Sequence, residues 1–308
     1  MKKSYLFLFH LGPVQAFIAQ ARKTQDLYAG SQLLGNLMHL ALWRANLAGN
    51  IIFPYFEAEQ YSMNLERNEE VHPNHFLARF NMEQEEVQTF GEELEVLLRK
   101  TLHETALEKF ESVLPEPYYL DCAEQTKGFL EIYWVAMEEG GDYGECYKQL
   151  EQRLGALKQA RQWTTLTEAG RKCSMSGQYN VKVYRKTKEE QIKSLENIRS
   201  SKLFAQDNFI VNDQSNHIQL RHLQLGEGLC AISFLKRLYK DDPTRPFPST
   251  AAIALLHLSK NTETRQLIEA FERMVEEGYD EQLLYEENLN ERYIERYGVV
   301  IKNGHDLI

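Results

Sequence analysis

The residues of this chain that most suggest chemistry surround a turn at Gly12-Pro13. An apolar run, residues 5–9, leads into the turn, and a helical pattern follows it. Proline near the first helical turn loses no intrahelical hydrogen bond, so a strand, a tight turn and a helix N-terminus are expected here. The free backbone N–H groups of such a turn can hold a phosphate or an RNA backbone. The alternative is that Gly12-Pro13 only joins a strand to a helix, with Arg22 and Lys23 on a solvated face.

Two other segments carry residue types that are common in catalytic sites. Gly140–Tyr143 is similar to the Gly-Gly-Asp-Asp signature of nucleotide cyclases, in which two carboxylates bind metal ions. It holds one aspartate, and Glu145 follows Asp142 by three residues, which favours a helix N-cap with a capping box. His305-Asp306 is the only adjacent His-Asp pair, and its C-terminal position favours an incidental tail. We therefore expect no catalytic residue in this chain.

A basic stretch, residues 182–202, is a candidate for contact with RNA or with a neighbouring protein. Its charged residues are Lys182, Arg185, Lys186, Lys188, Lys193, Arg199 and Lys202. The alternative is a solvated helix or a mobile insert. We expect Lys186, Lys188 and Lys193 to lie outside the core.

The pattern of apolar residues predicts an α+β fold around these candidate residues. Apolar spacing predicts strands over residues 4–10, 50–56, 75–80 and 129–137, and helices over 14–24, 30–48, 83–112 and 143–162. This order is that of a ferredoxin-like domain, the core of palm domains, which we assign to residues 1–163. The composition changes near residue 164. Residues 164–308 are expected to be a second, mainly helical region, with helices over 234–239, 250–258 and 261–277.

Composition and charge narrow the class of protein. Hydrophobic residues make up 43% and charged residues 26% of the 308 residues, which is ordinary for a globular chain. No apolar run approaches the roughly 18 residues that span a bilayer. A net charge of −10 argues against a free-standing, non-specific nucleic-acid binder, although a subunit can still meet RNA through its neighbours. Four scattered cysteines give no disulfide framework, so reduced thiols and a cytoplasmic location are expected.

Several phrases resemble, in the same order, the large, cyclase-like subunit of type III-B CRISPR effector complexes, the Cmr complexes. The sequence from His10 to Ser31 is similar to the opening of that subunit's first palm domain. The other matching phrases are Pro73–Ala78 (a strand), Gly141–Glu145 (a helix entry), Arg171–Gly177 and Leu229–Arg237 (the two knuckles of a zinc ribbon) and Phe247–Thr250 (a phrase after the ribbon). The resemblance covers residues 5–256.

The resemblance implies a zinc ribbon that has lost two of its ligands. In the family each knuckle is Cys-x-x-Cys, and four thiolates hold structural zinc tetrahedrally. Here serine stands at the second position of each knuckle, giving Cys173 with Ser176 and Cys230 with Ser233. A neutral, hard hydroxyl is a poor zinc ligand, so we expect a degenerate ribbon without bound metal. Candidate replacement ligands between the knuckles are Asp207, His217 and His222.

The resemblance also implies that the Gly12-Pro13 turn faces a second palm, with nucleotides between the two. The residues implied to line or border that nucleotide site are Gly12, Pro13, Val14, Gln15, Arg22, Lys23 and Ser31. The alternative, a plain strand–helix turn, stays open.

The function implied is that of a structural or assembly module in an RNA-guided antiviral effector complex. The sequence has no HD nuclease motif ahead of the palm and no Gly-Gly-Asp-Asp, so catalysis by the chain alone is not expected. The implied partners are other effector subunits, crRNA and target RNA, and not a membrane. One alternative is the non-catalytic half of a split cyclic-oligoadenylate synthetase, binding ATP and Mg²⁺ with a second palm polypeptide. Another is a stand-alone nucleotide-binding palm domain.

Overall fold

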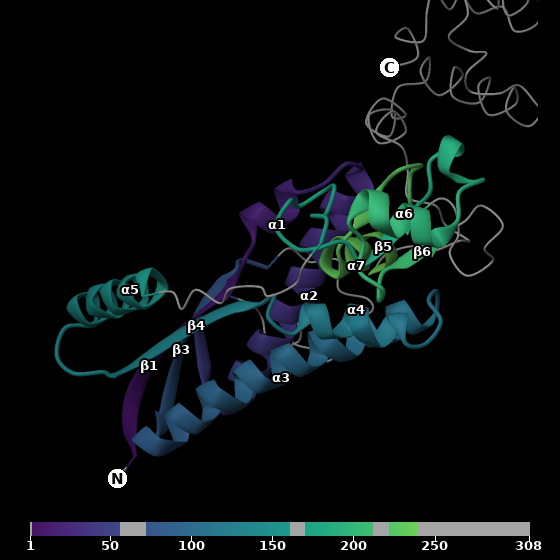
Figure 1. Ribbon diagram of the computed structural model, residues 1–308. Coiled ribbons are helices and arrows are strands. Elements are labelled where there is room, and N and C mark those ends of the chain that lie inside the picture. Colours follow the sequence, from purple (N-terminus) through teal and green to yellow (C-terminus); the bar gives the residue numbers. More distant parts are fainter. Residues whose placement is uncertain (1, 56–71, 161–169, 212–221, 240–308) are drawn as a thin grey trace, which may run out of the picture. The chain divides into compact units, whose positions relative to one another are not determined.

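The computed structural model of the chain describes residues 2–55, 72–160, 170–211 and 222–239 (Figure 1), and the structural account is limited to these. The elements up to residue 160 are β1 Lys3–Gly12, α1 Gln15–Ala19, α2 Thr24–Ala48, β2 Asn50–Phe53, β3 His75–Met82, α3 Gln84–Glu111, α4 Tyr118–Thr126, β4 Glu131–Glu138 and α5 Tyr143–Gln159. Those beyond it are β5 Val183–Arg185, the 3-10 helix η3 Lys188–Glu190, α6 Leu195–Lys202, β6 Phe209–Val211, β7 Gly228–Leu229 and α7 Ala231–Tyr239.

The first sheet has four antiparallel strands in the order β2-β3-β1-β4, with β1 in the interior. Phe7 of β1 lies opposite Ala78 of β3 on one side and Ala136 of β4 on the other. Residues 5–9 of β1 are all buried, because both faces of this strand are covered. The uninterrupted apolar run in the sequence is typical of a strand buried on both faces.

Helices cover the two faces of this sheet unequally. Phe7 and Phe9 of β1 belong to the large apolar core that also contains α2 and α3. Leu6 and Leu8 point to the opposite face, where they pack with residues of α5 (Figure 1). α3 approaches the sheet closely, since a Cβ atom at Gly91 would lie 2.5 Å from the ring of Trp134. Glycine at this position therefore permits the close packing of helix on strand.

The second sheet is small, with three strands in the order β6-β5-β7. β5 runs parallel to β6 and antiparallel to β7. β7 leads directly into α7, whose Phe234 stacks on Phe110 of α3 with ring centres 5.9 Å apart. The side chains of α7 therefore belong to the same apolar core as the first sheet.

The predicted α+β class is confirmed, and the first eight predicted elements are present with altered ends. α2 begins at Thr24 rather than at residue 30, and α1 is shorter than predicted. Gly30 does not interrupt α2. Glycine is needed here because a Cβ atom at this position would lie 2.7 Å from Cε of Lys236 in α7. α4 was not predicted.

Two predictions stay open after the fold is known. The boundary between residues 163 and 164 stays a prediction, and the predicted helices over residues 250–258 and 261–277 lie outside the described residues. Within the described part of the chain, no helix has both the length and the apolar composition needed to cross a membrane.

Candidate functional site

The linker between α1 and α2, residues 20–23, is held by two basic side chains of α7. The ammonium group of Lys236 donates hydrogen bonds to the backbone carbonyls of Phe17 and Gln20 and lies 4.3 Å from the centre of the Phe17 ring. These carbonyls belong to the C-terminal turn of α1, where backbone acceptors lack intrahelical partners. Burial of the ammonium group lowers the pKa of Lys236 to about 8. α7 thus satisfies and fixes the end of α1.

A buried ion network joins α7 to α2 and to the residue before β7. Nε of Arg237 lies 2.6 Å from Oδ1 of Asp26, and its two terminal nitrogens each lie 3.1 Å from a carboxylate oxygen of Glu227. Asp26 is fully buried and Glu227 is 2% exposed. Burial acts to lower the pKa of Arg237, but the two carboxylates outweigh burial and raise it. Each of these buried charges has a partner of opposite sign, as buried charges require.

The same network sets the conformation of the linker. Oδ2 of Asp26 accepts hydrogen bonds from the backbone N–H groups of Arg22 and Lys23, both at 3.1 Å. The guanidinium group of Arg22 donates to the backbone carbonyl of Ser174 at 3.0 Å and lies 3.6 Å from the carboxylate of Glu227. The expectation that Arg22 and Lys23 lie on a helix is wrong, because α2 begins at Thr24. Asp26, in the first turn of α2, holds the two preceding residues in the linker.

The residues predicted to border a nucleotide lie in two separate settings. Gly12 is buried at the end of β1, Pro13 and Val14 are half-buried, and Gln15 is exposed. Arg22 is turned toward the loop that holds Ser174, and Ser31 is half-buried within α2. Nucleotide binding by this set stays a prediction.

The four side chains of the predicted degenerate ribbon converge. Sγ of Cys173 and Sγ of Cys230 lie 3.5 Å and 3.3 Å from Oγ of Ser233. Oγ of Ser176 lies 3.7 Å from Sγ of Cys230. The backbone N–H of Met175 donates to the sulfur of Cys173, and the backbone N–H of Ser233 donates to the sulfur of Cys230. The structure therefore brings together two thiols and two hydroxyls from segments far apart in the sequence.

This donor set does not fit a closed structural zinc site. Such a site takes four nitrogen, sulfur or carboxylate ligands, whereas two of the four groups here are neutral hydroxyls. A hydrogen bond from Cys230, with a smaller one from Ser233, lowers the pKa of Cys173, while burial raises the pKa of Cys230.

The replacement ligands named from the sequence do not complete the set. The carboxylate of Asp207 lies 3.6 Å from the ammonium group of Lys182. His222 is buried, and its backbone carbonyl accepts a hydrogen bond from Arg237. His217 lies outside the described residues. Across the described ranges, no group of three or more histidine, cysteine, aspartate or glutamate side chains is suited to a metal ion.

The basic stretch is not the uniformly solvated surface that its sequence indicates. Lys182 and Lys186 are buried: the ammonium group of Lys182 lies 2.8 Å from Asp121, and that of Lys186 donates to the carbonyl of Lys193 at 3.1 Å. The expectation that Lys186 lies outside the core is therefore wrong. Arg185 is half-buried and donates to the carbonyl of Leu223. The side chains of Lys188 and Lys193 remain exposed and are available to a partner.

Of the two segments that carry residue types common in catalytic sites, only Gly140–Tyr143 lies within the described residues. The carboxylate of Asp142 accepts a hydrogen bond of 2.7 Å from the backbone N–H of Gly144 at the start of α5. The predicted helix N-cap is confirmed. His305-Asp306 lies outside the described residues.

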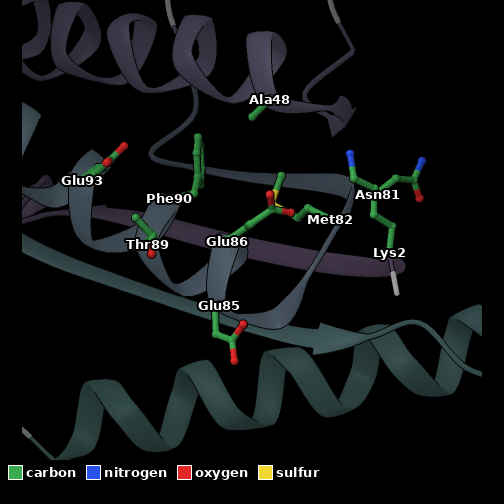
Figure 2. Close-up of a pocket in the computed structure, with 9 residues that line it drawn as sticks. All are labelled: Lys2, Ala48, Asn81, Met82, Glu85, Glu86, Thr89, Phe90 and Glu93. Atoms are coloured by element: carbon green, nitrogen blue, oxygen red, sulfur yellow. The ribbon is translucent and has the colours of Figure 1, made fainter.

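A surface hollow of about 470 Å³ is lined by residues at the start of β1 and the end of β3 (Figure 2). The Gly12-Pro13 turn lies at the other end of β1. Glu86 on the wall of the hollow accepts a hydrogen bond from the backbone N–H of Glu83 and so caps α3, and Glu93 lies 3.8 Å from Arg44. Its lining residues are Lys2, Ala48, Asn81, Met82, Glu85, Glu86, Thr89, Phe90 and Glu93. It contains none of the predicted site residues, and two of its carboxylates serve local structure.

Sequence reasoning missed the ion network altogether. Asp26, Glu227, Lys236 and Arg237 all lie in it or beside it and are buried. One signal was available: Lys236-Arg237 interrupts the apolar run of residues 229–239, and a basic pair inside an apolar helix needs buried acidic or carbonyl partners. The identity of those partners depends on contacts between distant segments.

Comparison with known proteins supports the resemblance seen in the sequence. Residues 6–115 match the sequence family described as CRISPR-associated protein Cmr2, N-terminal. No curated protein matches. Two solved structures of similar fold are a type III-B Cmr-beta complex in the apo state, with a TM-score of 0.54 and 15% identity, and the same type of complex bound to cognate target RNA, with 0.54 and 16%. In both cases the match covers 94% of this chain.

These matches define the extent of the likeness. The aligned region makes up 40% and 38% of the two solved chains, so this chain corresponds to about two fifths of each. The predicted resemblance to the large subunit of type III-B complexes is confirmed as a resemblance: residues 6–115 match the Cmr2 N-terminal family, and a similarity of fold extends over most of the chain.

Proposed function

We propose that this chain is a structural and assembly module of a type III-B CRISPR effector complex, an RNA-guided antiviral assembly. The observation that carries the proposal is the match of residues 6–115 to the Cmr2 N-terminal family. The similarity in fold to chains of Cmr-beta complexes supports it. The proposed partners are other subunits of the complex, crRNA and target RNA.

The sheet order supports the palm assignment within this proposal. A β-α-β-β-α-β chain with strands in the order β2-β3-β1-β4 and its crossover helices α2 and α3 in one core is the arrangement of ferredoxin-like domains. Residues 170–239 then correspond to the ribbon. Its two cysteine segments are held by hydrogen bonds and by the Arg237 ion network, which gives a physical reason why the fold can dispense with zinc.

Local contacts favour assembly over catalysis by this chain. Asp142, the aspartate in the cyclase-like phrase, is used as a helix cap. Arg22, implied to border the nucleotide site, donates to the backbone carbonyl of Ser174 and lies beside Glu227. Both groups therefore have structural roles that compete with binding a nucleotide.

The proposal is tested by purifying the tagged chain from cells that express a type III-B locus. We expect the other effector subunits and a crRNA to co-purify, and we expect only weak, salt-sensitive binding of the purified chain to free RNA, because its net charge is −10. Recovery of the chain alone, with no crRNA, would contradict the proposal. Tight binding to free RNA at physiological salt would also contradict it.

The exposed lysines of the basic stretch allow a sharper version of this co-purification test. The Lys188→Glu, Lys193→Glu double variant should release at least one subunit or the crRNA. The matched control is Lys100→Glu, Lys127→Glu, which makes the same change of charge at side chains that are 67% and 55% exposed on other elements. Equal recovery with both double variants would show that the basic stretch takes no part in assembly.

A further inference from the structure

Two cysteines of this chain lie beside the same serine hydroxyl, in a donor set that does not fit zinc. The sulfurs of Cys173 and Cys230 lie 3.5 Å and 3.3 Å from the same hydroxyl oxygen, that of Ser233. Cys173 is 3% exposed and Cys230 is fully buried. The other two cysteines, Cys122 in α4 and Cys146 in α5, lie elsewhere, and Cys146 packs on the far face of the first sheet.

Both sulfurs sit on well-fixed backbone. The backbone N–H of Cys173 donates to the carbonyl of Tyr179 at 2.8 Å, and the N–H of Gly177 donates back to the carbonyl of Cys173 at 3.0 Å. On the other side, the N–H of Phe234 donates to the carbonyl of Cys230 at 2.9 Å in the first turn of α7. The backbone N–H groups of Met175 and Ser233 donate hydrogen bonds to the two sulfurs, which both lie beside the hydroxyl of Ser233. This proximity is therefore built into the fold.

We propose that Cys173 and Cys230 form a reversible disulfide when the protein meets a peroxide. In the first step the thiolate of Cys173 attacks hydrogen peroxide, which breaks the O–O bond and gives a sulfenic acid and hydroxide. The sulfur of Cys230 then attacks the sulfur of Cys173; its thiol proton passes to the departing hydroxide, which leaves as water as the S–S bond forms. In sum, two thiols are oxidised, one peroxide is reduced, and two molecules of water are released.

The order of the two steps follows from the difference in exposure between the two cysteines. Cys173 is the less buried of the pair and adjoins half-buried residues of its own loop, so a small oxidant reaches it first. Cys230 is protected from the oxidant, which leaves it reduced and free to resolve the sulfenic acid.

The disulfide would act on the whole site, because it joins the 170–177 loop to the start of α7. The same helix carries Lys236 and Arg237, which hold the end of α1 and Asp26. A covalent link across this long stretch of chain restricts the unfolded state, and we expect the melting temperature to rise by roughly 5–10 °C on oxidation. The cross-link takes over the role that four thiolates and a metal play in a complete ribbon.

The test uses the full chain, reduced and then treated with a small molar excess of hydrogen peroxide. Free thiols are alkylated in denaturant, and peptides are identified by mass spectrometry. We expect a cross-linked peptide pair containing Cys173 and Cys230, reversed by dithiothreitol, while Cys122 and Cys146 remain alkylated in the same sample. These two cysteines are an internal control for unfolding during treatment.

Three results would overturn the proposal. These are alkylation of Cys173 and Cys230 at the level of the two control cysteines, over-oxidation of Cys173 without a cross-link, and protection of both thiols by a metal that co-purifies. The Cys230→Ser variant should lose the rise in melting temperature on oxidation. Because the peptide result on the natural sequence is decisive by itself, the test holds even if that variant folds poorly.

Discussion

Nε of Arg237 lies 2.6 Å from Oδ1 of Asp26, and this ion pair joins α7 to the start of α2 across more than two hundred residues of sequence. The second carboxylate oxygen of Asp26 holds the backbone of Arg22 and Lys23. The conformation of the linker between α1 and α2 therefore depends on α7, a helix about two hundred residues further along the chain. The Asp26–Arg237 pair thus ties the N-terminal part of the chain to the segment that contains Cys230 and Ser233.

The first prediction concerns that ion pair. Arg237→Met removes the cation and leaves the carboxylates of Asp26 and Glu227 buried without their main partner, so the free energy of unfolding should fall by about 3–5 kcal/mol. Urea unfolding followed by tryptophan fluorescence measures the change. Arg22→Met is the matched control: its side chain is 45% exposed, and its loss should cost less than about 1 kcal/mol. Equal, small losses in both variants would mean that the network adds little to stability.

The four-stranded sheet could be predicted because its strands carry their own signals. Residues 5–9 form an apolar run, Pro73-Asn74 precedes β3, and Asp142 caps α5 where the sequence places an N-cap. The residues that fix the candidate site could not be predicted in the same way. Nothing in the sequence around Asp26 indicates that this carboxylate is buried. Its partner Arg237 lies on α7, and only tertiary packing brings the two side chains together.

The basic stretch shows the same limit. The sequence does not distinguish its buried lysines from its exposed ones, yet Lys182 and Lys186 are buried while Lys188 and Lys193 are exposed. Lys182 is buried because Asp121 of α4, an element that the sequence did not reveal, lies 2.8 Å from it.

The second prediction separates these lysines. Lys186→Glu places a carboxylate next to the carbonyl of Lys193 in a buried position, so it should destabilise the protein by about 2–4 kcal/mol. Lys188→Glu with Lys193→Glu should change stability by no more than about 0.5 kcal/mol each, because both side chains are exposed. Thermal melts of the three proteins decide the matter. A stable Lys186→Glu protein would contradict the burial of this side chain.

The third prediction restores a metal site. Zinc should be substoichiometric in the natural protein, whereas Ser176→Cys with Ser233→Cys places four thiols where two thiols and two hydroxyls now converge. This double variant should bind about one zinc per chain and melt at a higher temperature, since binding to the native state adds to stability. Elemental analysis and melts with and without a chelator measure both effects.

A control variant has the same number of cysteines as this double variant, but one of them lies outside the cluster. Ser174 lies in the same loop, but its hydroxyl accepts a hydrogen bond from the backbone N–H of Gly228 at 3.2 Å rather than joining the cluster. Ser174→Cys with Ser233→Cys should therefore gain less zinc than the first pair. One zinc per chain in the natural protein would overturn the prediction.

The fourth prediction concerns His10, at the end of β1 opposite His75 of β3. Burial, and to a lesser degree the charge of Lys158, lowers the pKa of His10 to about 4. Its Nε2 lies 2.9 Å from the amide nitrogen of Asn74, and within the described structure its buried Nδ1 has no hydrogen-bond partner. The folded protein therefore resists protonation of this ring, whereas the unfolded chain takes up the proton near pH 6.5.

The sign of the effect follows from linkage. Between these two pKa values the unfolded state binds more protons, so the stability contributed by neutral His10 is complete above pH 6.5 and is lost as the pH falls toward 4. After allowance for partial solvent exposure, the loss should be about 1–2 kcal/mol. Denaturant unfolding at pH 7.0, 5.5 and 4.5 should show a steeper decline for the natural protein than for His10→Asn. Lys158→Met should give an intermediate decline, because it removes the smaller cause of the shift and leaves the burial. Identical pH profiles for the natural protein and His10→Asn would show that the ring is not held neutral by the fold.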